Sequence, residues 1–203
     1  MSSGPRIAPL PKDEWGDDAI ATLKAAYGEA AANRILSDAP DAPALPNVLA
    51  TLMRNPGLTG PFLVYNASLM RAPLLGKRHF ELMVLRVAWR TRSTYEWSQH
   101  VRLAQRVGIT IEEVEAVGRG SEAEGWTPLE ADLLAATDQL IDRYCVDDET
   151  WARLAKQLDE RQLMEMAFIV GTYTCLAMAF NSFGIEVDPG LEGVPAPPLP
   201  TDR

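Results

Sequence analysis

Glu96 and His100 are the residues whose types and spacing are best suited to chemistry in this sequence. They stand four positions apart in the stretch Tyr-Glu-Trp-Ser-Gln-His, and residues at this spacing lie on one face of a helix. Projecting residues 93–107 at 3.6 residues per turn places both beside Trp97 and Val101, on the apolar side. A carboxylate and an imidazole on an apolar face are candidates for general acid–base catalysis.

Glu81 is the second candidate, because the segment around it is apolar on nearly every side. A carboxylate there is expected to be partly removed from water, which suits it to moving protons near neutral pH. If this segment packs antiparallel to the next one across the turn at 90–92, Glu81, Glu96 and His100 form a proton-transfer site.

Two structural alternatives compete with this catalytic interpretation. Glu96 and His100 can satisfy each other as a buried pair that only fixes helix packing. Glu81 can likewise pair along its own helix with Lys77 or Arg78. Ser93 stands at the start of the helix that carries Glu96, where an N-cap role is preferred to that of a nucleophile.

The elements that must position these residues are all helices. Pairs such as Thr110 with Glu113 and Thr127 with Glu130 are capping boxes, and Asp159 with Gln162 starts the last helix in the same way. The helical segments predicted from caps and apolar spacing are 14–36, 45–53, 61–70, 74–89, 93–107, 110–118, 128–144, 148–158 and 159–183. No stretch alternates with period two for long enough to indicate a strand, so the fold class is all-α.

The organisation predicted along the chain has three parts. Residues 1–44 form an N-terminal helical arm and linker, 45–186 a compact helical domain, and 187–203 a Pro-rich, extended tail. The uncharged run 166–180 has 15 residues, fewer than the roughly 20 needed to cross a bilayer, so a buried core helix or a subunit interface is expected there.

Composition excludes several classes of partner and site. The formal net charge is −9 and no basic block occurs, which argues against nucleic acid and anionic membrane surfaces. The N-terminus lacks the apolar core of a signal peptide, so a soluble cytoplasmic protein is expected. Only two histidines and two cysteines, Cys145 and Cys175, are present. A zinc site or a thiol centre therefore has few ligands, and neither a metal nor a cofactor is expected.

These residues together resemble the carboxymuconolactone decarboxylase and alkyl hydroperoxidase D (AhpD-like) superfamily. The resemblance rests on Glu81, the twelve-residue step to Ser93, Tyr-Glu-Trp before His100, and Gly-Ile-Thr at 108–110, and it is clearest over 55–118. In the hydroperoxidase branch a CxxC pair occupies the positions of Ser93 and Glu96. Neither residue can form a disulfide, so the decarboxylase branch is the closer likeness.

The resemblance implies a helical domain that assembles into homo-oligomers and binds a small molecule. It also implies a cofactor-free lyase or isomerase that acts on a small carboxylated lactone or ring compound. In that case His100 is the general acid or base, Glu96 orients it, and Glu81 delivers a proton. Trp97 and Ser93 are then expected to contact the substrate.

Arg90, in the turn between the two helices, is expected to hold a carboxylate of the substrate. Two other functions remain open at this stage. One is a noncatalytic oligomeric protein, in which case no enclosed pocket is expected near His100. The other is peroxide reduction through Cys145 or Cys175 without a CxxC pair.

Overall fold

The computed structural model describes residues 4–191 and 197–200 and is built from helices. Within these residues there are ten α-helices, a short 3₁₀ helix (Lys12–Glu14) and no strand, which confirms the all-α prediction. The α-helices are α1 (Asp17–Tyr27), α2 (Glu29–Leu36), α3 (Asn47–Leu52), α4 (Pro56–Arg71), α5 (Lys77–Thr91), α6 (Thr94–Arg106), α7 (Ile111–Arg119), α8 (Pro128–Arg143), α9 (Asp148–Leu154) and α10 (Glu160–Phe183).

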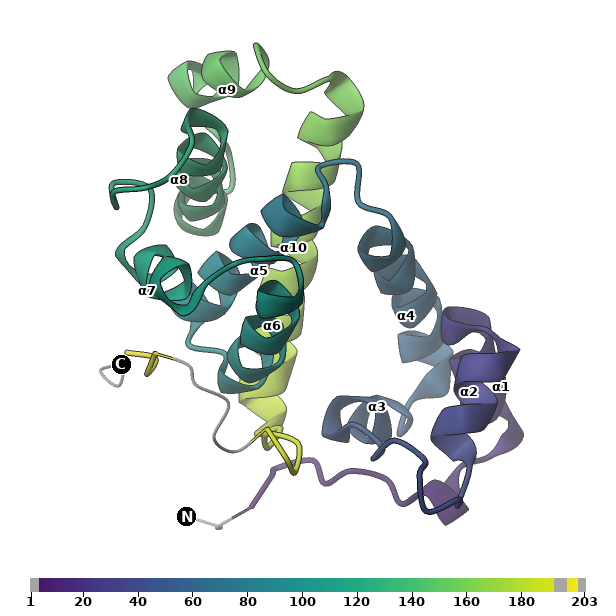
Figure 1. Cartoon of the computed structure of the whole chain (residues 1–203). Helices are drawn as coiled ribbons and strands as arrows, with labels where there is room; N and C mark the ends of the chain where they lie inside the picture. Colours follow the sequence, from purple (N-terminus) through teal and green to yellow (C-terminus); the bar gives the residue numbers. More distant parts are fainter. Residues whose placement is uncertain (1–3, 192–196, 201–203) are drawn as a thin grey trace.

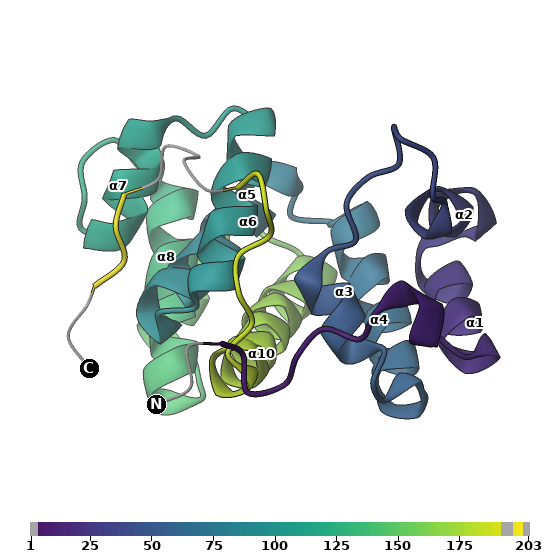
Figure 2. The same cartoon turned by 90° about the horizontal axis from the view of Figure 1, so that it is seen from below.

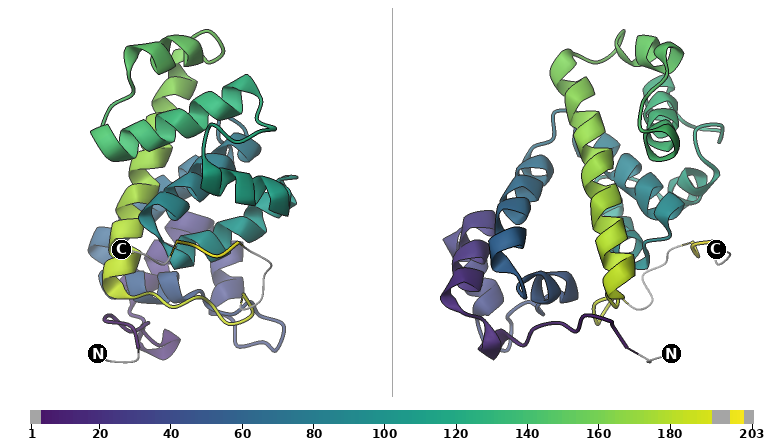
Figure 3. Two further views of the ribbon diagram at one scale, coloured as in Figure 1. Left: turned by 90° about the vertical axis from the view of Figure 1, so that its left-hand side faces the viewer. Right: turned by 180° about the vertical axis from the view of Figure 1, so that it is seen from behind.

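Helix α10 runs through the middle of the molecule (Figure 1). On one side lie α1 to α4, and on the other α5 to α9, as the views from below and behind also show (Figures 2 and 3). Helix α10 packs most closely on α5 and α8. The two groups of helices therefore face each other across the C-terminal half of α10.

The N-terminal helices pack on α4 through a hydrophobic cluster of their own. Trp15, Leu23 and Leu63 are among its buried members. The single helix predicted over 14–36 is two helices, because Gly28 has φ 84°. Glycine reaches that backbone conformation at little cost, whereas a side chain would be strained there. The segment predicted as an arm thus brings α1 and α2 against the rest of the fold.

Helices α5 and α6 form a tight hairpin, the feature that the proton-transfer hypothesis required. Arg92 ends α5 in the left-handed conformation, with φ 54°, and Ser93 begins α6. The two helices pack along each other. On this hairpin, Leu82, Leu85 and Val101 belong to a buried cluster shared with α7.

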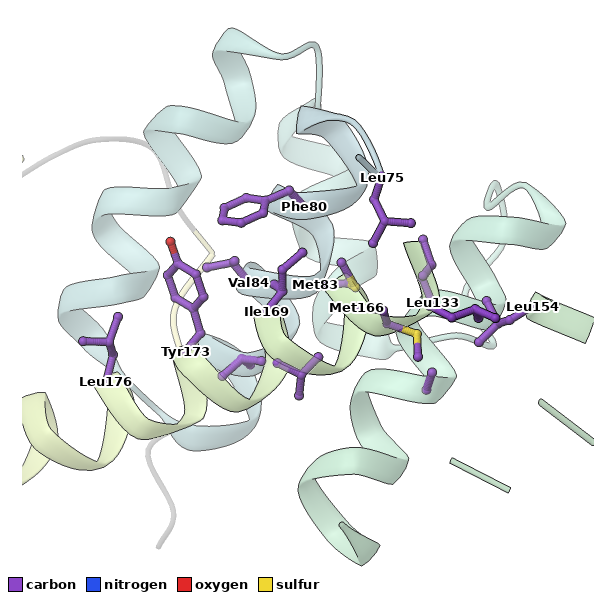
Figure 4. Packing of buried hydrophobic residues seen from close by; sticks show 14 of the residues in the cluster. Leu75, Phe80, Met83, Val84, Leu133, Leu154, Met166, Ile169, Tyr173 and Leu176 are labelled. Carbon is purple, nitrogen blue, oxygen red and sulfur yellow. The ribbon is translucent and has the colours of Figure 1, made fainter. Parts of the chain in front are cut away.

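Helix α10 supplies the central core together with α5 and α8. Met166, Ile169 and Tyr173 point from it into a cluster that includes Phe80 and Leu133 (Figure 4). By length and composition this helix could cross a membrane, because it has 24 residues and not the 15 of its uncharged run. The expectation that this segment is too short to cross a bilayer was therefore wrong. Half of the apolar window is buried in the fold.

The start of the predicted tail is held against the domain. Asp188 is 9% exposed and accepts hydrogen bonds from the Asn47 backbone N–H (2.7 Å), the Tyr95 hydroxyl (2.9 Å) and Gln99 Nε2 (2.6 Å). Further on, the Pro197 carbonyl accepts a hydrogen bond from Trp97 Nε1. These described parts of the tail are docked, whereas residues 192–196 and 201–203 of it lie outside the described residues.

Candidate active site

The buried pair at the centre of the site is His100 with Glu81, not His100 with Glu96. His100 Nδ1 lies 2.7 Å from Glu81 Oε2 across the α5–α6 hairpin, and both side chains are buried. Glu81 does not pair along its own helix, because Arg78 turns outward to Glu113 and Glu130. Nδ1 faces α5, which leaves Nε2 as the ring nitrogen without a partner among the described residues.

Glu96 stands alone one turn before His100. It is 2% exposed, and neither carboxyl oxygen has a hydrogen-bond partner in the described part of the chain. Burial raises the pKa of Glu96 to about 8, against a smaller opposing effect of the Ser93 hydroxyl. The expectation that Glu96 orients His100 is therefore wrong, and so is the alternative of a mutually satisfied Glu96–His100 pair. At neutral pH Glu96 is mainly a neutral carboxylic acid, able to donate a proton.

Ser93 occupies the N-cap position of α6, as predicted, but its hydroxyl makes no capping hydrogen bond. The residue is fully buried and its Oγ has no partner among the described residues. It does not belong to the cavity lining described next. Ser93 therefore lies behind Glu96, where a substrate in this cavity would not meet it.

A cavity of about 380 Å³ opens between the two groups of helices. One wall comes from α1 to α4, with Phe62 and Leu63, and the other from α6 and α10, with Leu103 and Leu176. Most lining side chains are apolar, and the volume falls in the range of small-molecule sites. Both Glu96 and His100 line this cavity, whereas Glu81 does not and reaches it only through His100.

Tyr173 is the lining residue that the sequence reasoning missed. Its ring meets the His100 ring edge to face at 5.0 Å between centroids, and it also contacts Phe80. The residue is 1% exposed, and its hydroxyl has no partner in the described structure. Burial, assisted by the nearby carboxyls of Glu81 and Glu96, raises the pKa of Tyr173 well above its usual value. Its position in an apolar run gave no indication of a functional role, because a tyrosine in such a run usually packs in the core.

Arg90 and Trp97 are not placed to contact a substrate in this cavity, contrary to expectation. Arg90 forms ion pairs with Asp138 (2.6 Å) and Asp142 (2.7 Å) on α8. The ring of Trp97 packs on Trp89 in the cluster shared with α7. Both side chains point away from the cavity, because Arg90 pairs with α8 and Trp97 packs in the cluster shared with α7.

Arg102 is the cation that does line the cavity. It is exposed and donates one hydrogen bond, to Gln99 Oε1 at 3.3 Å. In the described residues it has no acidic partner, so its guanidinium is available to a carboxylate. Arg102 lies on the exposed side of α6. Only the approach of α1 to α4 makes that edge of the helix the rim of a cavity.

Neither cysteine belongs to the site. Cys145 and Cys175 are both exposed free thiols, and the cavity lining includes neither. Among the described residues, no three His, Cys, Asp or Glu side chains converge as metal ligands. The polar groups that line the cavity include Glu96, His100, Tyr173 and Arg102.

Comparisons with known proteins agree with this fold. Residues 58–139 match the model of the carboxymuconolactone decarboxylase family. No curated protein sequence matches the chain. The family match lies over the region in which the sequence resembles the carboxymuconolactone decarboxylase and AhpD-like superfamily, and it confirms that resemblance.

Solved structures similar to the chain cover nearly all of it. The debrominase Bmp8, in a cysteine-to-alanine variant bound to 2,3,4-tribromopyrrole, has a TM-score of 0.71 at 15% identity and covers 95% of this chain and 96% of its own. The AhpD core of an uncharacterized peroxidase-related protein from Ralstonia eutropha JMP134 has a TM-score of 0.70 at 16% identity, with 91% and 94% covered. At these identities the likeness establishes the fold alone.

Proposed function

We propose that the chain is a cofactor-free acid–base enzyme, a lyase or isomerase, that acts on a small carboxylated lactone or ring compound. The observation that carries this proposal is the pairing of His100 with Glu81 at the edge of an apolar cavity that also contains an unpaired, buried Glu96. A base and an acid in one mostly apolar pocket are the groups that proton transfer between carbon atoms needs.

The roles follow from the contacts. Glu81 accepts the Nδ1 proton of His100 and holds the ring, which makes it a positioning residue, and Nε2 becomes the basic nitrogen that faces the substrate. His100 takes a proton from a substrate carbon, and the neutral Glu96 carboxyl returns one elsewhere on the same molecule. Transfer of the imidazolium proton to Glu96, one helical turn away, restores both groups.

The shape and charge of the cavity support the substrate class. A volume of about 380 Å³ with mostly apolar walls suits a single substituted ring, and Arg102 at the rim suits one carboxylate on it. Debrominase Bmp8 binds a small ring compound, 2,3,4-tribromopyrrole, in a similar fold. That observation supports a ring-sized ligand here.

The test is turnover, in D₂O and followed by NMR, of a panel of carboxylated lactones and unsaturated ring acids. His100→Gln is expected to lower turnover at least about a hundredfold, since a positioned acid or base contributes about 10²- to 10⁴-fold. Glu81→Gln should lower it as well, through loss of ring orientation. His79→Gln is the matched control, because His79 bonds only to the Leu75 carbonyl, two residues before its own helix begins. Full activity in both site variants would refute the proposal.

The other two functions have less support from the structure. A noncatalytic role was expected to leave no enclosed pocket near His100, yet that residue lines the cavity. Peroxide reduction would have to use exposed thiols outside the cavity, and thiol titration during peroxide exposure tests it directly. The homo-oligomer stays a prediction, and we place its contact on the outer face of α10, where Met164, Phe168 and Met178 are exposed.

A further inference from the structure

Four of the polar side chains in the cavity wall are buried, namely Tyr95, Glu96, His100 and Tyr173, and the Tyr95 hydroxyl donates to Asp188. His100 and Glu96 move protons, whereas Tyr173 only adjoins them. We propose that the Tyr173 hydroxyl is a catalytic hydrogen-bond donor to a carbonyl oxygen of the substrate. The inference rests on the proposed function and narrows its substrate class to compounds whose reacting carbon is conjugated with a carbonyl group.

The Tyr173 hydroxyl is unfavourable where it is buried. A buried hydroxyl without a partner destabilises the fold relative to a satisfied one, and phenylalanine would fill the same space without that cost. Tyr173 is 1% exposed, and its hydroxyl is without a partner in the described structure. Figure 4 shows its ring standing off α10, with the oxygen at the far end. A polar atom held in this way next to a cavity has a natural partner in a ligand.

Tyr173 also lies next to the proposed base, His100. The edge-to-face contact at 5.0 Å keeps the phenol beside the imidazole, and both rings line the same cavity. A substrate carbon in contact with Nε2 would therefore have its neighbouring substituents close to the Tyr173 hydroxyl. Glu96 completes the arrangement from the same helix as His100.

The protonation state of the Tyr173 hydroxyl also suits a hydrogen-bond donor. Two carboxyl groups nearby, those of Glu81 and Glu96, oppose a negative charge on the phenol, and burial acts in the same direction. Tyr173 therefore keeps its proton and acts as a donor, not as a base. Around the reacting carbon, Tyr173 is a neutral donor with no other bond to make in the described residues, as is the Glu96 carboxyl, whose proton goes to carbon.

The chemistry balances without any added reactant. As His100 takes the proton from the carbon next to the carbonyl, the C–H electron pair becomes a new C=C bond and the carbonyl π pair moves onto oxygen. Tyr173 donates a hydrogen bond to that oxygen and keeps its own proton. Loss of carbon dioxide from a carboxylate β to the same carbonyl places an electron pair on the same oxygen. When Glu96 delivers a proton to carbon, the carbonyl forms again, and Glu96 regains its proton from His100 in the isomerisation and from solvent water in the decarboxylation.

The probe for this donor is 4-nitrophenol, whose anion carries a charged oxygen on a flat ring and is recognised by its visible absorption. Tyr173→Phe is expected to weaken its binding about tenfold to a hundredfold, which is the range for a hydrogen bond to a charged group. Binding of 4-nitroaniline, which has no acceptor oxygen at that position, should change by less than about threefold. Tyr65→Phe is the matched control, because that hydroxyl bonds to Thr172 and is outside the cavity lining.

A second measurement separates this role from packing. The midpoint of thermal unfolding of ligand-free Tyr173→Phe should equal or exceed that of the wild type, because a costly buried hydroxyl is removed. Equal loss of both probes, no loss of either, or failure of 4-nitrophenol to bind the wild type would overturn the assignment. None of these results affects the turnover test with His100→Gln and Glu81→Gln, so the two proposals fail independently.

Discussion

The most informative perturbation is Glu96→Gln, which removes one titrating proton from the core and little else. In the folded protein the pKa of Glu96 is about 8, whereas the ordinary value is 4.5. Between these two values the folded chain holds a proton that the unfolded chain has released. The free energy of unfolding therefore falls as pH rises through this window, and the contribution levels off above pH 8. Glutamine does not titrate, so this pH dependence of the free energy of unfolding is absent from Glu96→Gln.

The magnitude follows from the two pKa values. One pKa unit corresponds to about 1.36 kcal/mol, so full ionisation of buried Glu96 costs the folded state on the order of 5 kcal/mol. Between pH 5.5 and pH 7.5 the stability of the wild type should fall relative to that of Glu96→Gln by about 2–3 kcal/mol. For a chain of this length that difference corresponds to about 5–10 °C in the midpoint of thermal unfolding.

The assay is urea unfolding of the wild type and Glu96→Gln at both pH values, with the difference between the two proteins taken at each pH. Other titrating groups cancel in this double difference. Glu115→Gln, which replaces an exposed glutamate on α7, controls for loss of a carboxylate as such. A Glu96→Gln difference that is equal at the two pH values, or that favours the wild type as pH rises, would refute the assignment of a neutral, desolvated Glu96.

Two further predictions concern Arg102 at the rim of the cavity and Asp188 at the start of the tail. Arg102→Gln should weaken binding of benzoate about tenfold without loss of stability, as seen by NMR titration, whereas Arg90→Gln should leave benzoate binding intact and lower stability by about 1–2 kcal/mol. Asp188→Ala should lower the free energy of unfolding by about 2–4 kcal/mol, measured in urea, because the buried Tyr95 hydroxyl and Gln99 lose a charged acceptor. An unchanged urea midpoint would show that the tail is not held through Asp188.

Most helices could be predicted from the sequence because their ends are encoded locally. The capping boxes that begin with Thr110, Thr127 and Asp159 are all present in the structure. The main error was a continuous helix over 14–36, which Gly28 divides. An isolated glycine in a helical pattern does not reveal whether the chain will turn there, because that depends on what the following segment packs against.

The site was predictable as a set of residues but not as a set of roles. Spacing placed Glu96 and His100 on one face, and an apolar helix marked Glu81. Which carboxylate bonds to the imidazole depends on the rotation of α6 against α5. Residues on different faces of a helix can contact different neighbouring helices, and which of these contacts form depends on how the helices pack.

The sequence by itself determined the helices, the resemblance to the superfamily, the acid and base groups, and the absence of a thiol at the positions of Ser93 and Glu96. These follow from local hydrogen bonding, from periodicity and from residue identity, all of which are properties of the chain. Tertiary structure decided that Glu81 holds His100, that Glu96 is desolvated, and that Tyr173 and Arg102 line the cavity, with Arg90 and Trp97 outside it. The physical reason is that burial and contact across helices arise from segments far apart in the chain, and both the pKa of a carboxyl group and the reach of a side chain depend on them.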